Sequence, residues 1–288
     1  MTAHGKVFYL NNKSLIEEIH RSKISYSSYL SPEYAAFDAV VKNKKFITEQ
    51  FITKTREKKA KEIYQGKMAE LKATGLKTQQ IKIDQIDPLS IPVETLVFRV
   101  MEFDHIPLLA PEELKNIKSE KDKHIKVNFP PYAHYIIKDN QFIQVGRSHW
   151  KGDFNAGEFN QDHGKTTHKL ALMYLSLVDR YGQKGNWRGY SYIEEMKCQA
   201  LLQLSQRGLS FDESVSEIPN PFAYYTQLVK NAFTRVLNLE KKAQSMRDDM
   251  LLFMGATPSY TKQVEAEFAH HESNSPHKTR QSDLDLEE

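Results

Sequence analysis

The stretch NPFAYYTQLVKNAFTRVLNLEKK, residues 220–242, decides the fold of the C-terminal half of this chain. Asn220 is a typical N-cap, and Pro221 suits the first helical position, where a missing N–H costs nothing, so a helix is expected to begin here. On a 3.6-residue period, one face of this helix is apolar and should be buried: Phe222, Tyr225, Val229, Ala232, Phe233 and Val236. The other face carries Tyr224, Gln227, Asn231, Thr234, Arg235 and Asn238. Amides, a hydroxyl, an arginine and an aromatic ring suit phosphates, base edges and unstacked bases, so this face predicts a DNA-reading helix.

Two further helices are expected before this one, over residues 166–181 and 191–207. The first has an apolar stripe from Leu170 to Tyr181. The second has Ser191 and Glu194 as a capping box and Gly208 at the position after its end. Short connections between three amphipathic helices predict a helical bundle in the C-terminal half.

The N-terminal half reads differently. Asn11 or Asn12 is expected to cap a short helix, and a second helical stripe within residues 42–82 ends near residue 75. Residues 96–103 are expected to form a strand, and residues 135–137 and 142–145 a hairpin about Asp139-Asn140. The fold class is therefore predicted as mainly α, with a helical bundle preceded by a smaller α+β or loop-rich insertion. The predicted divisions are 1–40, 41–160, 161–250 and 251–288, the last with short helices and a disordered acidic tail.

Charge and composition narrow the choice of partners. The 288 residues are 40% hydrophobic with a formal net charge of only +3, so any contact with DNA must come from a local patch. Residues 42–82 hold 12 lysines and arginines against 4 glutamates, which fits either a solvated helix or a surface that follows phosphates or binds a partner. The lone Cys198 suits a reducing cytoplasm, and no apolar run is long enough to span a bilayer.

Several patterns typical of enzymes are incomplete. Gly164-Lys165-Thr166 lacks the first glycine of a phosphate-binding loop, because residue 159 is Phe159. A loose group of possible metal ligands follows no familiar zinc spacing: His149, Asp153, Asp162, His163 and His168. Cys198 reads as a packed or half-exposed small residue rather than a nucleophile. We therefore expect no catalytic site, no metal and no cofactor.

Two segments carry a family resemblance. Residues 194–242 contain Glu195-Met196, Gly208-Leu209, Phe211-Asp212-Glu213 and Asn220-Pro221-Phe222-Ala223-Tyr224, and residues 6–19 read KVFYLNNKSLIEEI. This sequence pattern resembles region 2 of bacterial sigma factors, and in particular the late-transcription sigma factors of T-even-type tailed phages. The resemblance covers about a third of the chain and does not extend to residues 40–160. It implies a non-enzymatic sigma factor that binds host core RNA polymerase and recognises and melts an A·T-rich −10-like element, in the cytoplasm of an infected bacterium.

The resemblance also implies roles for individual residues. The outward side of the second bundle helix would meet the clamp coiled coil of the largest polymerase subunit through Glu195, Gln199, Leu202 and Gln206. In the third helix, Lys230, Asn231, Thr234 and Arg235 match the stretch that reads the upstream edge of the −10 element, with Asn238 following. The tryptophan pair of primary sigma factors is replaced by Gln227 and Leu228, so stacking on melted bases would fall to Tyr224 or Tyr225, unless these tyrosines belong to the core.

The phage late sigma factors lack a helix-turn-helix domain for the −35 element and bind the phage sliding clamp through a C-terminal tail. Here too little foldable sequence follows residue 268 for such a domain. The tail SDLDLEE has Leu284 and Leu286 among acids but lacks an aromatic anchor. The resemblance implies that it contacts a sliding clamp, and a merely solubilising tail is the alternative. Two alternatives stay open: a regulator that binds polymerase or clamp without reading DNA, and an enzyme such as a nuclease that uses the His149–His168 loop.

Overall fold

The computed structural model describes residues 10–73, 86–114, 119, 121–161, 164–216 and 218–273. Its N-terminal half is built on a five-stranded sheet with the order β1-β5-β4-β3-β2. The bounds are β1 Ser27–Tyr29, β2 Ala39–Val41, β3 Phe98–Val100, β4 Ala133–Lys138 and β5 Gln141–Ser148. The β2–β3 pair is parallel and the other pairs are antiparallel. A separate two-stranded ribbon pairs β6 (Trp150–Lys151) with β7 (Glu158–Phe159).

The predicted hairpin is confirmed. Lys138 pairs with Gln141 across a two-residue turn, and both Asp139 and Asn140 have positive φ, of 49° and 60°. Two successive left-handed residues make a type I′ turn, whose twist matches that of the paired strands, and Asp and Asn tolerate this conformation well. The predicted strand at residues 96–103 is also present but shorter, as β3. The predicted boundary between residues 40 and 41 falls inside β2.

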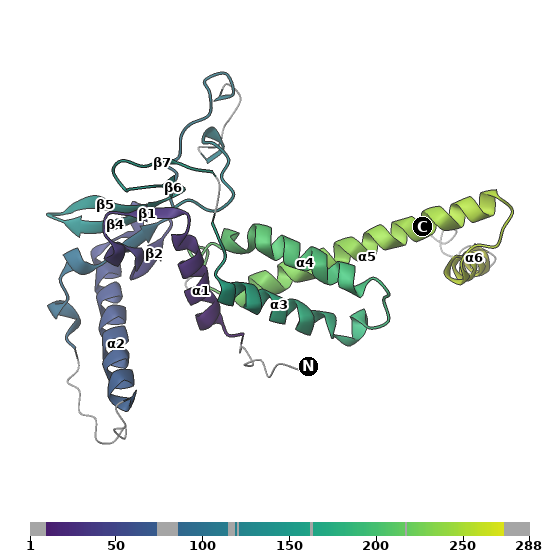
Figure 1. Ribbon diagram of the computed structural model, residues 1–288, viewed down its shortest axis with the longest axis horizontal. Helices are drawn as coiled ribbons and strands as arrows, with labels where there is room; N and C mark the ends of the chain where they lie inside the picture. Colours follow the sequence, from purple (N-terminus) through teal and green to yellow (C-terminus); the bar gives the residue numbers. More distant parts are fainter. Residues whose placement is uncertain are drawn as a thin grey trace, which may run out of the picture.

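One helix packs on the sheet. α2 (Glu49–Ala73) places Phe51, Ile52 and Ala60 against apolar residues of the β3 segment, including Phe98. Its remaining surface is largely exposed, and Figure 1 shows it running away from the sheet. Residues 49–73 of the basic segment therefore form a helix with one buried side and an exposed basic surface.

The C-terminal half is helical, as predicted. It consists of α3 (His168–Gly182), α4 (Ile193–Arg207), α5 (Pro221–Phe253) and α6 (Tyr260–Ser273), and α1 (Asn12–Ile24) joins the same core. With the five-stranded sheet in the N-terminal half, the molecule is mixed α/β rather than mainly α. Figure 1 shows α3 and α4 beside the first half of α5, whose second half extends beyond them toward α6.

Local signals explain most helix ends. Asn11 accepts a hydrogen bond from Ser14 N at the start of α1, and Asn220 accepts one from Ala223 N at the start of α5. The predicted capping box of α4 is wrong, because its N-cap is Tyr192 and makes no side-chain cap bond. The third bundle helix is longer than predicted: it runs to Phe253, where Gly255 (φ 72°) follows its end.

Candidate nucleic-acid and polymerase interface

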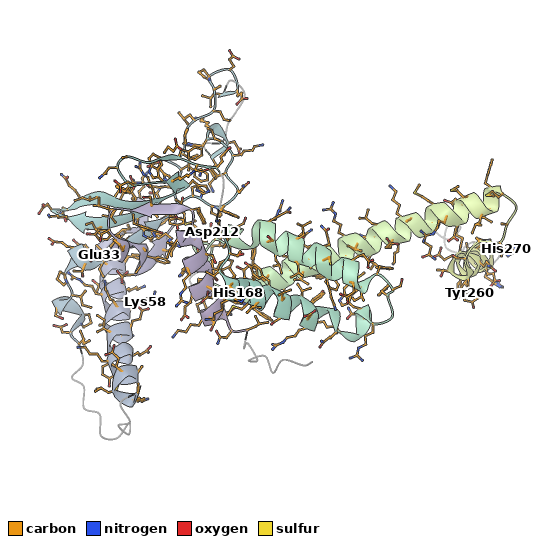
Figure 2. The ribbon with its side chains drawn as sticks, in the orientation of Figure 1. Glu33, Lys58, His168, Asp212, Tyr260 and His270 are labelled. Carbon is orange, nitrogen blue, oxygen red and sulfur yellow. The ribbon has the colours of Figure 1, made fainter. Side chains whose placement is uncertain are left out.

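A buried ionic network fixes the turn between α4 and α5. Lys23 Nζ of α1 donates to Phe211 O at 2.7 Å and to both carboxylate oxygens of Glu213, at 2.8 and 2.9 Å. Arg99 of β3 lies between the Phe37 and Tyr132 rings, and its guanidinium is 3.8 Å from the Glu213 carboxylate. Figure 2 labels the neighbouring Asp212 at this junction of sheet and helices. The Phe-Asp-Glu turn that precedes α5 is thus held by the N-terminal half.

Burial and the neighbouring charges shift the pKa values of the ionisable groups in this network. Burial alone would raise the pKa of the Glu213 carboxyl, but Lys23, the His20 ring at 3.4 Å and Arg99 hold that pKa well below its usual range. Burial lowers the pKa of Lys23, and Glu213 opposes that effect. Burial and the charge of Arg99 lower the pKa of His134. His134 Nε2 accepts from Arg99 Nε at 2.9 Å, so Nδ1 carries the proton and donates to Tyr34 O at 2.6 Å. The ring is therefore neutral in the folded protein.

Stability should fall as the pH drops from 7 to 5. Burial lowers the pKa of His20 and His134, and burial lowers that of His105 to about 4, so these rings stay neutral after the unfolded chain has taken up protons near pH 6.5. A depressed folded-state pKa gives stability that is present above the unfolded pKa and lost below it. Each ring that stays neutral lowers the free energy of unfolding at pH 5 by up to about 2 kcal/mol relative to pH 7.

Urea unfolding measured at both pH values tests this expectation. His134→Gln keeps an acceptor for Arg99 and should reduce the loss of stability between pH 7 and pH 5. The same change at the exposed His168 should leave the loss unaltered. An unfolding free energy that is the same at pH 7 and pH 5 would contradict the assignment of neutral buried rings.

The predicted DNA-reading residues share one exposed face of α5. Gln227, Lys230, Asn231, Thr234, Arg235 and Asn238 are exposed and, with Leu239 and Lys242, line a shallow depression along the helix. Gln227 Nε2 donates to Asn231 Oδ1 at 2.7 Å, which orients the two amides relative to each other. The opposite side is core, since Val229, Ala232 and Phe233 are each 0% exposed. A rigid helix therefore presents two cations, three amides and a hydroxyl to solvent, a set suited to phosphates and base edges.

The two tyrosines proposed for base stacking differ. Tyr225 is 0% exposed, and its hydroxyl donates to Gly208 O at 3.0 Å, so it is a core residue and offers no face for a base. Tyr224 is half-buried, with its hydroxyl bonded to Arg207 O and one side against Phe211. Of the two tyrosines, only Tyr224 has a partly exposed ring and stays a candidate for stacking. Phe222, predicted to be buried, is 39% exposed because the first turn of α5 lies at the edge of the bundle.

Gly208 is needed for a different reason from the one predicted. Its φ is −62°, an ordinary right-handed value, so no left-handed cap explains it. A Cβ there would collide with the hydroxyl of Tyr174, which packs against Tyr225 in the core. The close approach of Tyr174 therefore selects glycine at this turn.

A second hollow joins Tyr224 to the end of α4. It is lined by Val127, Asn128, Phe129, Ser205, Gln206, Arg207, Ser210, Tyr224 and Leu228. Sequence reasoning missed Asn128, Arg207 and Ser210 as candidate contacts. Asn128 comes from the segment to which the resemblance does not extend, and no spacing along the chain connects it to α5.

The predicted polymerase-binding residues share the outward face of α4. Glu195, Gln199, Leu202 and Gln206 follow a spacing of 4, 3 and 4 residues, while Met196, Ala200 and Leu204 of the same helix are fully buried. Leu202 is 50% exposed at the centre of this face, and Gln199 is half-buried. The outward face of α4 thus presents one apolar and three polar side chains.

The remaining sequence predictions concern the C-terminal tail, the loose group of possible metal ligands and Cys198. Leu284 and Leu286 fall outside the described residues, as do Asp162 and His163 of the loose ligand group. Within the described ranges no three His, Cys, Asp or Glu side chains gather to hold a metal ion, and His149 is 2% exposed. Cys198 is exposed. None of the described helices has the length and apolar character needed to cross a membrane.

Comparisons with protein-family models, with curated proteins and with solved structures each find no match.

Proposed function

We propose that this chain is a sigma factor of the phage late-transcription type, which binds host core RNA polymerase and recognises and melts an A·T-rich −10-like promoter element. The observation that carries the proposal is the exposed polar face of α5 beside the outward face of α4, both with the residue types that the sigma resemblance implies. In this proposal the bundle of α3, α4 and α5 is a sigma region 2-like domain that acts in the cytoplasm of the infected cell, with no catalytic step and no cofactor.

The division of labour follows the two faces. Glu195, Gln199, Leu202 and Gln206 of α4 dock on the clamp coiled coil, which places α5 along the promoter. Asn231 and Thr234 then contact base edges, while Lys230 and Arg235 contact phosphates. Tyr224, with Gln227 nearby, holds unstacked bases at the hollow between α4 and α5, where each stack is worth about 1–3 kcal/mol. The expected contact of Leu284 and Leu286 with a sliding clamp belongs to the same proposal.

Replacing Leu202 tests the polymerase contact. Leu202→Asp places a charge at the centre of the α4 face and should weaken binding to core polymerase by about 2 kcal/mol, or ~30-fold. Leu175→Asp, on α3 and 43% exposed, is the matched control and should bind as the unaltered protein does. Titration of fluorescently labelled protein with core polymerase gives both values. Equal binding by all three proteins would exclude this face as the polymerase contact.

The alternative is a regulator that binds polymerase or the sliding clamp without reading DNA. It shares the α4 contact but gives the α5 face no role, so changes at Asn231 and Arg235 would leave promoter opening intact. Transcription by core polymerase on an A·T-rich late promoter, with and without the protein, separates the two functions. Initiation that depends on the protein supports the sigma proposal.

A further inference from the structure

The apolar spacing of α5 continues past the bundle. Tyr225, Val229, Ala232 and Val236 are separated by 4, 3 and 4 residues and pack in the bundle core. The same alternation of 3 and 4 continues through Leu239, Ala243, Met246, Met250 and Phe253. An alternating 3 and 4 spacing is the heptad pattern of a seam that packs against another helix. We call these last five residues the distal seam.

The distal seam has no helix on it among the described residues. Leu239 is 57% exposed, Met246 59%, Met250 63% and Phe253 94%. α6 lies at this end of α5 and contacts mainly the other side, because Asp248 accepts hydrogen bonds from Ser259 N and Ser259 Oγ at 2.8 and 2.7 Å. One further contact reaches the edge of the seam, where Lys262 of α6 pairs with Asp249 at 3.4 Å. Asp248 is two residues from both Met246 and Met250, and so it points away from the seam. Figure 1 shows this half of α5 projecting from the bundle toward α6.

The charges beside the distal seam match opposite charges beside the distal seam of a second, antiparallel copy. In heptad terms Glu240 and Arg247 flank one edge of the seam, and Lys242 and Asp249 flank the other. In an antiparallel pair that sets Ala243 opposite Met246 of a second copy, Glu240 faces Arg247 of that copy and Lys242 faces its Asp249. The twofold axis repeats both contacts, so two Glu240–Arg247 pairs border one edge of the seam. At the other edge, Lys242 of each copy joins an Asp249 that also pairs with Lys262 of its own α6 at 3.4 Å. The same register sets the small Ala243 against the large Met246, and Leu239 against Met250, which fills the seam evenly.

A parallel pair lacks this match. There Lys242 would lie beside Arg247 of the second copy, where two cations repel each other, and this repulsion offsets the attraction between Arg235 and Glu240 in the same arrangement. Charge therefore favours the antiparallel arrangement over the parallel one.

We propose that the distal seam binds the distal seam of a second copy of this chain, as an antiparallel helix pair. Leu239 and Lys242 belong both to the seam region and to the depression on the α5 face. Pairing covers that end of the polar face, so the dimer is a form in which the face is partly closed. The inference does not rest on the proposed function, since it follows from spacing, exposure and charge on α5 alone.

Charge exchange tests the pairing directly. Glu240→Lys and Arg247→Glu each turn two attractive contacts into repulsive ones and should each weaken dimerisation by about tenfold or more in sedimentation velocity. The double variant, which combines Glu240→Lys with Arg247→Glu, restores opposite charges across the pair and should dimerise as the unaltered chain does. A mixture of the two single variants should form a heterodimer for the same reason. Circular dichroism checks that each variant is folded.

Cysteine pairs test the direction. In a Cys198→Ser background, Leu239→Cys mixed with Met250→Cys should form a disulfide between copies. Met250→Cys alone should not, because the antiparallel register holds the two positions ~16 Å apart along the axis. The proposal would be overturned if the unaltered protein stayed monomeric up to high micromolar concentration. It would also be overturned if neither the double variant nor the mixture of single variants dimerised. Loss of polymerase binding in Met250→Lys, with a monomeric unaltered protein, would instead assign the seam to polymerase.

Discussion

Glu213→Gln is expected to destabilise the protein by about 3–5 kcal/mol, because it leaves two buried cations without their carboxylate. Lys23 and Arg99 are each 0% exposed, and Glu213 is 4% exposed. A buried ion pair adds little net stability compared with an apolar replacement, but removing one partner exposes the full cost of the other's desolvation. Chemical denaturation followed by circular dichroism measures the change. Since Glu213 lies in the turn before α5, the same substitution should also loosen the start of that helix.

Glu62→Gln is the matched control for this prediction. Glu62 pairs with Lys58 one turn away on α2 at 3.7 Å, and both side chains are exposed. Such a surface pair is worth about 0.5 kcal/mol or less. A loss of stability in Glu213→Gln no larger than that in Glu62→Gln would show that the junction network is not what holds the α4–α5 turn.

The second large effect is expected on promoter opening. Asn231→Ala combined with Arg235→Ala removes an amide and a cation one turn apart on the exposed face of α5. At about 1–3 kcal/mol for each contact with a base or phosphate, opening should fall at least ~30-fold. Permanganate reactivity of unpaired thymines at the promoter reports opening directly. Binding to core polymerase should be retained, because the α4 face is unchanged.

Gln50→Ala combined with Lys54→Ala provides the control. These two residues are also an exposed amide and an exposed cation one turn apart, but on α2. Their removal should leave opening within about twofold of the unaltered protein, since isolated surface changes shift free energies by less than ~0.5 kcal/mol. Equal opening by the two double variants would favour the regulator that does not read DNA.

Much of the helical half could be predicted because its signals are local. Asn220 caps α5 as expected, and the spacing of Val229, Ala232 and Phe233 identified the face that is buried. The extension of α5 to Phe253 was missed although the heptad spacing continues, because the charged run Glu240–Lys242 reads as a helix end. Tyr225 was placed among the candidate stacking residues for its chemistry, whereas its 3.6-residue position already put it on the core side.

The junction between the halves could not be predicted. Lys23 and Arg99 are of residue types that usually lie on the surface. They are buried beside Glu213 only because α1 and β3, which are far from residue 213 in the sequence, pack against that turn. The same holds for Asn128, which meets Tyr224 across a hollow whose two sides are far apart in the sequence. Sequence periodicity identifies which face of an element is buried, but not which other element covers it.

The central claim is most directly tested by run-off transcription with purified host core polymerase on a promoter that has an A·T-rich −10-like element and no −35 element. Adding the protein should produce transcripts from one start site, with permanganate-reactive thymines in the element, and the Asn231→Ala, Arg235→Ala variant should lose both signals. No added initiation, with or without a sliding clamp, would contradict the proposed sigma function.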